Sequence, residues 1–413
     1  MKKQHSIEKS YLRIAFRFIV LLPFFLGLLF IGGIVLGYLT TELKNGSTLR
    51  PLYENENRNE IKSQKTLLIM GIDRGIDADS EFVDFLALVS VDDSEGIFKV
   101  FNISPKFAPY IQERDEYISF KSLLVYLKTY YPLENPIDRY LEEVEKVMAI
   151  NIDGYVYVTK NGMGDYANII GSIKISSPSE VEDDDLPGFV INKGDNYLTG
   201  DRLVDFVSLD QNGDNDKLQR QLSAVQSLAS NIDIFKLFFY QAKLSKLINS
   251  EVNSSLNMFD IAKLFYKIKF QNYKFQVGYT NADNAIRVKN ELDERWYTVF
   301  NTLDKDIQKI FINEKVKREQ AKVDIFNATN TSGLARNRSR RLENQGLRIV
   351  LVGNTNQKYE KTTVYLNGQN DYSNTLEEIY NTLDSDEIEI LNEKYDGRSV
   401  GDIVIVLGNN ELN

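Results

Sequence analysis

Two aspartates stand at the ends of neighbouring apolar runs. Asp73 follows the run LLIMGI, and Asp84 precedes the run FLALV. Continuous aliphatic runs of this length are typical of buried strands. If the two strands are neighbours in one sheet, both carboxylates lie at one edge of it, where they can hold a divalent cation for phosphate chemistry. The other interpretation of this spacing is a pair of solvated aspartates in a loop.

A second polar segment, DQNGDND at 210–216, has the beginning of a calcium-loop pattern. Oxygen ligands occupy its first, third and fifth positions. However, Asn215 stands where the sharp-turn glycine belongs, and Gln221 stands where the bidentate glutamate belongs. We therefore reject an EF-hand and expect a polar loop that leads into a helix. Lys217 and Arg220 near the start of that helix would form a phosphate cradle.

The composition excludes several kinds of catalytic site. The chain has 413 residues, no cysteine and one histidine, His5. Disulfides, thiolate chemistry, Ser-His-Asp sites and histidine-rich zinc sites are therefore excluded. The net charge of −10 argues against nucleic acid as a partner. Any catalysis must use carboxylates, lysine, arginine, hydroxyls or a metal ion held by oxygen.

One long apolar segment predicts a membrane anchor. Residues 18–41 carry no charge and, at about 1.5 Å per residue, can cross a hydrocarbon core of roughly 30 Å. The basic tail 1–17 predicts a cytoplasmic N-terminus. A cleaved signal peptide is the alternative, which the length of the run and the lack of a small-residue cleavage site disfavour. We expect a single-pass protein of the cell membrane, with one transmembrane helix and its main domains outside the cytoplasm.

The rest of the chain mixes strand and helix patterns, which predicts an α/β fold. After a polar stalk, 42–64, the first domain spans 65–284 and is followed by a charged helical connector, 285–320. Within the first domain we expect strands at 66–71, 85–91, 97–103, 154–158 and 172–176. Helices are expected at 119–130, 137–149 and 217–230.

A smaller α/β domain occupies 322–413. VDIFNA predicts its first strand, Ser332-Gly333 the start of a helix and Gly346 the end of that helix. Four arginines lie on this helix: Arg336, Arg338, Arg340 and Arg341. Charged runs on helices are usually solvated. The alternative is a patch that binds an anionic wall polymer.

Several motifs resemble those of the LytR–CpsA–Psr family of cell-envelope proteins. GID and DFLALVSVD resemble its aspartate-bearing strand pair, FNISPK its S-i-P-R-D motif, and DNDKLQRQ its D-f-g-R-i-x-R-Q motif. Residues 150–175 resemble a further family stretch, and 322–408 resemble the C-terminal domain found in many members. The residues that stand at the functional positions of these motifs are Asp73, Asp84, Lys106, Asp214, Lys217, Arg220 and Gln221.

The resemblance implies a phosphotransferase that takes a glycopolymer from a polyprenyl pyrophosphate carrier and joins it to a peptidoglycan hydroxyl. The implied fold is a mixed-sheet domain with an apolar tunnel for the lipid chain. The implied cofactor is Mg²⁺, held against the pyrophosphate while cations stabilise charge in transfer. The implied roles are Asp73 and Asp84 as metal ligands, Lys106 and Arg220 as catalytic groups, and Lys217, Gln221 and Asp214 as substrate-binding groups.

The chain departs from the family pattern mainly where arginines are expected. The departing residues are Phe82, Lys106, Phe107, Ser208, Asp210 and Lys217. Lysine keeps the charge of arginine but loses its planar two-pronged contact with phosphate. Asp210 would repel pyrophosphate. A neighbouring arginine, Arg74 or Arg202, is a candidate to compensate.

Two functions of different classes therefore remain open. The first is an altered glycopolymer transferase with a reduced set of arginines. The second is a non-catalytic protein that binds polyprenyl lipid or acts as a cell-wall scaffold, because the loss of charge-stabilising groups commonly lowers rates by orders of magnitude. A third function, transcriptional regulation, is implied by the older naming of the family and is disfavoured by the acidic charge and the expected location.

Overall fold

The structure is a computed structural model that describes residues 64–412 with internal gaps. The expected tail 1–17, the expected transmembrane helix 18–41 and nearly all of the expected stalk 42–64 lie outside the described residues. The internal gaps are 76–79, 94, 112–114, 134, 184–187, 231–239, 257–259, 261–263, 265–266, 268–270, 272, 282–285, 291–292, 298–299, 369–371 and 386.

The predicted localisation needs correction. In the part of the chain that the structure describes, no helix is both long and apolar enough to cross a membrane. The longest helix there, α6 (Asp214–Ser230), has 17 residues and acidic side chains in its first turn, whereas a span needs about 20 apolar residues. The prediction of a single-pass membrane protein with extracytoplasmic domains is wrong by this finding, and segment 18–41, on which it rested, is not among the described residues.

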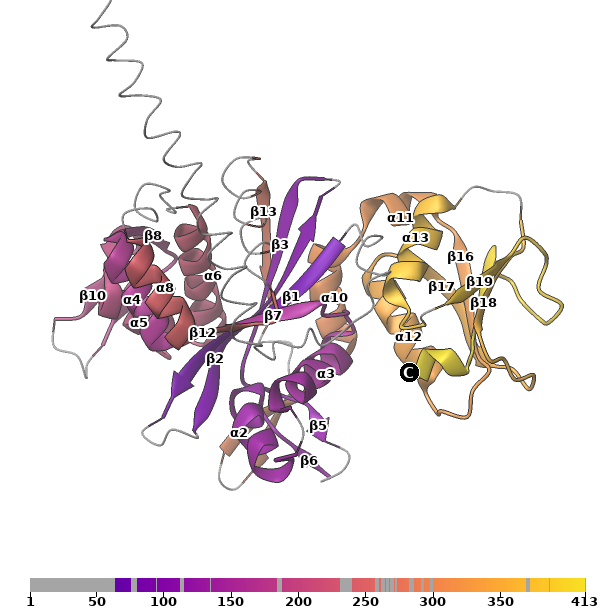
Figure 1. Cartoon of the computed structure of the whole chain (residues 1–413), viewed down its shortest axis with the longest axis horizontal. Helices are drawn as coiled ribbons and strands as arrows, with labels where there is room; N and C mark the ends of the chain where they lie inside the picture. Colours follow the sequence, from indigo (N-terminus) through magenta and orange to yellow (C-terminus); the bar gives the residue numbers. More distant parts are fainter. Residues whose placement is uncertain are drawn as a thin grey trace, which may run out of the picture. The chain divides into compact units, whose positions relative to one another are not determined.

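A six-stranded mixed sheet forms the centre of the first domain (Figure 1). Its strand order is β12-β7-β1-β2-β3-β13, with β7–β1 and β3–β13 parallel and the other neighbours antiparallel. This architecture confirms the expected mixed α/β fold. The strands are β1 (Gln64–Arg74), β2 (Glu81–Asp92), β3 (Ile97–Ile103), β7 (Gly154–Thr159), β12 (Val252–Ser254) and β13 (Lys274–Tyr279).

The two faces of this sheet bury separate apolar cores. Leu88 and Phe101 belong to the larger core, to which α2, α3 and α10 contribute, while Ala87 and Val100 belong to the smaller core with Leu222 of α6. Successive side chains along a strand point to opposite faces of the sheet, so neighbouring residues enter different cores. In α2, FKSLLVYLKTY, apolar residues recur at helical spacing and face the larger core. The helices are α2 (Phe120–Tyr130), α3 (Pro136–Met148) and α10 (Phe300–Phe311).

A flanking group of elements packs beside the sheet around a third core. Helices α4 and α5 and the antiparallel strand pair β8–β11 supply most of that core, and α8 packs against α4. The elements are α4 (Lys160–Ile170), β8 (Ile173–Ser177), β9 (Val181–Glu182), β10 (Val190–Ile191), β11 (Gly194–Leu198), α5 (Gly200–Ser208) and α8 (Gln241–Glu251).

Residues 285–320 differ from the expected helical connector. Their first half forms the hairpin β14–β15, which joins β4 in a small sheet. Helix α10 follows and buries Leu303 and Ile307 in the larger core of the first domain, so it is part of that domain. The remaining elements here are β4 (Phe107–Ala108), β5 (Tyr110–Ile111), β6 (Glu116–Tyr117), β14 (Ile286–Asn290), β15 (Asp293–Tyr297) and α11 (Glu314–Glu319).

The C-terminal domain contains a five-stranded sheet in the order β17-β16-β20-β18-β19. The expected strand at VDIFNA and the expected helix between Gly333 and Gly346 are both present, because a short apolar run forms the strand and the two glycines bound the helix. The elements are β16 (Lys322–Asn327), α12 (Leu334–Asn344), β17 (Arg348–Asn354), β18 (Thr362–Leu366), α13 (Ser373–Thr382), β19 (Ile388–Leu391), β20 (Ile403–Leu407) and the short 3₁₀ helix η3 (Asn409–Leu412).

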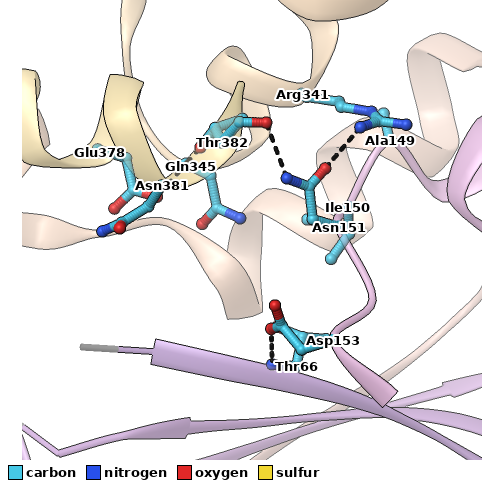
Figure 2. A pocket seen from close by; sticks show the side chains of 10 residues that line it. All are labelled: Thr66, Ala149, Ile150, Asn151, Asp153, Arg341, Gln345, Glu378, Asn381 and Thr382. Atoms are coloured by element: carbon cyan, nitrogen blue, oxygen red, sulfur yellow. Dashed lines mark hydrogen bonds between the residues drawn. The ribbon is translucent and has the colours of Figure 1, made fainter. Parts of the chain in front are cut away.

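Polar contacts join the two domains, which belong to one compact unit, Asn55–Asn413. Asn151 donates to the carbonyl of Thr382 at 2.7 Å and accepts from Nη1 of Arg341 at 2.7 Å (Figure 2). The arginine-rich helix α12 is neither fully solvated nor an open patch. The side chains of Arg338, Arg340 and Arg341 are only 11–12% exposed and are paired with carboxylates, whereas Arg336 is exposed.

Candidate functional site

A β-bulge lies beside Asp73 and Asp84. Gly71 of β1 is opposite Phe85 of β2, whereas Ile72 is opposite Val83, so Asp84 is the extra residue on β2. Val83 faces the larger core and Phe85 the smaller one, although residues two apart in a regular strand share a face. The bulge therefore changes the phase of β2 and re-aims the Asp84 side chain.

Asp73 and Asp84 converge on the ammonium group of Lys160. Its Nζ lies 2.7 Å from Asp73 Oδ2 and 3.2 Å from Asp84 Oδ2. The Asp84 side chain is 11% exposed, whereas the Asp73 side chain is 48% exposed. Burial opposes the charge on Lys160, but Asp84 and Asp73 outweigh it and raise the pKa of Lys160 above its usual value. The two carboxylates are thus neighbours across one lysine.

Sequence reasoning did not find Lys160. It is the first residue of α4 and directly follows β7. Strand β7 runs parallel to β1, with Thr159 opposite Ile72. Lys160 follows Thr159 and Asp73 follows Ile72, so these two residues lie side by side. The available signal was a lysine immediately after the predicted strand 154–158. It becomes informative only when that strand is known to pair with the strand that carries Asp73.

A second lysine, Lys217, occupies the other side of Asp84. Its Nζ lies 3.1 Å from Asp84 Oδ1 and 3.0 Å from Asp210 Oδ1. Asp84 therefore binds one ammonium group on each oxygen. The result is a row of alternating charges, which we call the charge row: Asp73, Lys160, Asp84, Lys217 and Asp210.

A small pocket opens beside the charge row. Lys106 lines it and forms an ion pair with Asp214, with 2.6 Å between Nζ and Oδ1. Lys121, at the start of α2, also lines the pocket, and its positive charge helps lower the pKa of Asp210. The lining residues are Asp84, Ser104, Pro105, Lys106, Lys121, Asp210, Asp214, Lys217, Leu218 and Gln221.

The pocket brings together one lysine that the sequence analysis did not single out, Lys121, and six residues that it did. These six are Asp84, Lys106, Asp210, Asp214, Lys217 and Gln221. Three lysines from three separate segments face it, and α6 begins at its wall with Asp214. Ammonium groups and a helix N-terminus together favour phosphate oxygens over other ligands. The arrangement can neutralise a phosphate or pyrophosphate group once the ammonium groups exchange their carboxylate partners for it.

Arg220 and Gln221 hold α6 in place from inside the protein. The guanidinium of Arg220 is fully buried and donates to Asp216 Oδ2 at 2.8 Å, to the carbonyl of Leu209 at 2.5 Å and to the carbonyl of Phe206. Arg220 is not among the residues that line the pocket. Gln221 donates to the backbone carbonyl of Asp84 at 3.0 Å, so it fixes the distance between α6 and β2.

Comparison with protein families decides the assignment. The model of the LytR_cpsA_psr family matches residues 38–311, which is more than half of the chain. The chain belongs to the LytR–CpsA–Psr family. A second model, described as LytR cell envelope-related transcriptional attenuator, matches residues 320–410 and covers the C-terminal domain. The expected family and its C-terminal domain are therefore both confirmed. No curated protein matches the chain.

The chain is similar to several solved structures at low sequence identity. TagV of Bacillus subtilis is 16% identical, and the match covers 60% of this chain and 96% of TagV with a TM-score of 0.49. A transcriptional regulator from Enterococcus faecalis is 16% identical over 60% of this chain and 86% of its own, with a TM-score of 0.47. TagT bound to LI-WTA is 18% identical over 63% and 92%, with a TM-score of 0.46.

Three of the residues that the sequence analysis expected to differ from the family motifs, Lys106, Asp210 and Lys217, line the pocket. Burial opposes ionisation of Asp210, but Lys217 outweighs it and lowers the pKa of Asp210, so the carboxylate is charged. Neither Arg74 nor Arg202 lines the pocket. Arg74 pairs with Glu81 and Glu251, each at 3.4 Å, and Arg202 lies over the ring of Phe189.

The cofactor implied by the LytR–CpsA–Psr resemblance, Mg²⁺, stays a prediction. Mg²⁺ requires near-octahedral oxygen coordination at about 2.1 Å. Here Asp73 and Asp84 share the ammonium of Lys160, which takes the position between them. Among the residues that the structure describes, no group of three or more Asp, Glu, His or Cys side chains is arranged to hold a metal ion. The donor set as it stands does not fit Mg²⁺.

Proposed function

We propose that the protein transfers a glycopolymer from polyprenyl pyrophosphate to a peptidoglycan hydroxyl during cell-wall assembly. The acceptor oxygen forms a bond to the phosphorus that carries the glycan. The bond from that phosphorus to the bridging oxygen breaks, and polyprenyl phosphate leaves with the electron pair. The acceptor proton passes to the solvent. The product is a phosphodiester between the glycan and peptidoglycan, and the apolar tunnel for the polyprenyl chain is part of this proposal.

The observation that carries the proposal is the convergence of three lysines on the pocket at the start of α6. Lys106, Lys121 and Lys217 come from different segments and face the same small space. Their charges would neutralise the pyrophosphate oxygens and stabilise the negative charge that develops on the leaving phosphate. In this proposal Arg220 and Gln221 act as positioning residues, because they hold α6 against β2.

A specific observation also favours a second candidate, binding of the carrier lipid without transfer. Lys217 is paired with Asp210 and Lys106 with Asp214, so carboxylates already balance two of the three pocket lysines. Lysine also lacks the two-pronged contact that arginine makes with phosphate. A pocket of this kind would bind a phosphate group loosely and stabilise a transition state poorly.

The experiment that separates the candidates follows one substrate through two measurements. Purified protein is incubated with a polyprenyl-pyrophosphate-linked oligosaccharide and peptidoglycan fragments, and both lipid binding and release of polyprenyl phosphate are measured. Lys217→Ala and Lys106→Ala are the test variants. Lys174→Ala is the matched control, because its ion pair with Asp195 is exposed and lies outside the pocket.

Release that falls in the two pocket variants and persists in the control supports transfer. Binding that falls in the same variants, with no release from any protein, supports the second candidate. If the unmodified protein neither binds nor releases the lipid, both candidates are overturned. Equal release by the pocket variants and the unmodified protein would separate the reaction from this pocket.

A further inference from the structure

The ammonium group of Lys160 lies where a cation shared by two carboxylates would lie. Asp73 reaches it from the end of β1 and Asp84 from the bulge in β2, with N–O distances of 2.7 and 3.2 Å. The lysine is delivered by the pairing of β7 with β1, so its position follows from the central sheet. The carboxylates of Asp73 and Asp84 are therefore already paired with a cation, which is the ammonium group of Lys160.

The lysine retains the means to contact a ligand. An ammonium group has three N–H donors, and the two carboxylates use two of them. The Lys160 side chain is 23% exposed, so it is not fully enclosed by the protein. Lys217 binds the other oxygen of Asp84. A phosphate oxygen that approaches the charge row thus finds two ammonium groups held by one buried carboxylate.

A divalent ion would have to displace this lysine to bind both aspartates. Displacement would leave an ammonium group, more than half withdrawn from water, without its two partners, and unpaired charges of that kind are costly. The ordinary role of a metal ion beside a phosphate is to neutralise charge and hold the phosphate in place. A tethered ammonium group supplies part of the same charge without a free ion.

We propose that Lys160 is the built-in cation of this site, so that the protein binds a pyrophosphate group without a divalent metal. The inference rests on the proposed function for the identity of the anion. Lys160 takes the place between Asp73 and Asp84, and Lys217 supplies the second positive charge. Removal of the Lys160 side chain opens the place between the two carboxylates to a divalent ion.

The test measures metal binding and anion binding separately on the full-length protein. Mn²⁺ binding is followed by electron paramagnetic resonance without any phosphate, and inorganic pyrophosphate binding is followed by calorimetry in EDTA and in excess Mg²⁺. The variants are Lys160→Ala, which opens space, Lys160→Met, which keeps the length, and Lys160→Arg, which keeps the charge. Lys174→Met is the control, because it also removes a carboxylate-paired lysine.

For the unmodified protein we expect no specific Mn²⁺ site and pyrophosphate affinities that agree within about twofold with and without Mg²⁺. Lys160→Ala should gain one Mn²⁺ site and lose about tenfold in pyrophosphate affinity in EDTA, with recovery in Mg²⁺. Lys160→Met should lose affinity in EDTA, and Lys160→Arg should retain most of it.

The proposal is overturned if the unmodified protein binds Mn²⁺ at one specific site, or if its pyrophosphate binding requires Mg²⁺. Both measurements use the unmodified protein, so they decide the matter even if a variant does not fold. If pyrophosphate binds under no condition, the proposed function fails, while the Mn²⁺ measurements on the unmodified protein and Lys160→Ala still decide whether Lys160 excludes a metal ion.

Discussion

Arg340 and Asp304 form a two-pronged ion pair between the two domains. Nε of the arginine lies 2.7 Å from Oδ2 of the aspartate, and Nη2 lies 2.7 Å from Oδ1. The same guanidinium donates to the carbonyls of Lys146 and Val147 at the end of α3. Only arginine presents enough donors in one plane for all of these contacts. The pair therefore fastens α12 to α10 and α3 at once.

Arg340→Ala should loosen the C-terminal domain from the first domain. It leaves Asp304 and two carbonyls without this partner, and loss of one member of a buried ion pair costs about 3–5 kcal/mol. We expect a lower urea midpoint and faster cleavage by protease after residue 311. Arg336→Ala on the same helix is the control, because Arg336 is exposed and should change stability by less than about 0.5 kcal/mol. Equal loss in both variants would contradict this role.

Arg220→Lys should destabilise the first domain although it keeps the charge. Lysine cannot reach Asp216 and the carbonyls of Leu209 and Phe206 together. At least one buried acceptor then loses its hydrogen bond, at about 1–3 kcal/mol for each group. Urea denaturation measures the loss. A Lys variant as stable as the unmodified protein, with reduced phosphate binding, would instead place Arg220 in direct contact with the ligand.

Asp210→Asn should strengthen binding of pyrophosphate. The substitution removes the carboxylate from Lys217 and leaves that ammonium with Asp84 as its partner. Since it also removes a negative charge from the pocket wall, we expect affinity to rise about tenfold, as for about 1.4 kcal/mol. Calorimetry with inorganic pyrophosphate measures it. Asp195→Asn, which removes the carboxylate from exposed Lys174, should leave the affinity unchanged. Weaker binding by Asp210→Asn would show that Asp210 assists the ligand.

Glu145 should make the stability of the protein depend on pH. Burial raises its pKa from the ordinary 4.5 to about 7, while Arg341 and the hydrogen bond from the Ile152 N–H oppose the shift. The folded protein therefore holds this proton more tightly than the unfolded chain. The resulting stability is fully present below pH 4.5 and is lost as the pH rises through about 7.

Glu145→Gln provides the test, because glutamine still accepts from Ile152 and does not titrate. Between about pH 5 and 8, the unmodified protein should lose up to about 3 kcal/mol relative to this variant. Urea midpoints of both proteins across that range give the difference. Parallel curves for the two proteins would rule out Glu145 as the titrating group.

Local sequence patterns predicted the strands and helices well, since burial imposes its period on apolar residues. The run 85–91 lies within β2, and 119–130 nearly coincides with α2. Region 285–320 was expected to be helical throughout, but its first half is a short hairpin. The amino-acid composition does not change between this hairpin and helix α10, so the boundary was not visible in the sequence. Helix α12 showed the same limit, since a run of arginines does not reveal that carboxylates of other elements will surround it.

The sequence pointed to the carboxylates that the structure brings together, but only to some of the cations beside them. Asp73 and Asp84 were found because they flank recognisable strands, whereas Lys160 acts through the pairing of β7 with β1. Arg220 matched a motif, but only its burial shows that the guanidinium serves α6. A one-dimensional pattern gives the identity of a charged residue but not its partner.

The charge row also bears on how a ligand arrives. Its three carboxylates outnumber its two ammonium groups by one, so the row itself projects no attractive field for an anion into solution. A diphosphate would reach it by ordinary diffusion, and its association rate would vary little with ionic strength. Selection would occur after contact, when the phosphate oxygens take the place of carboxylates that the lysines already hold. Such a site distinguishes ligands by how well they replace the carboxylates as partners of the lysines. Its specificity therefore lies in how long a ligand stays bound.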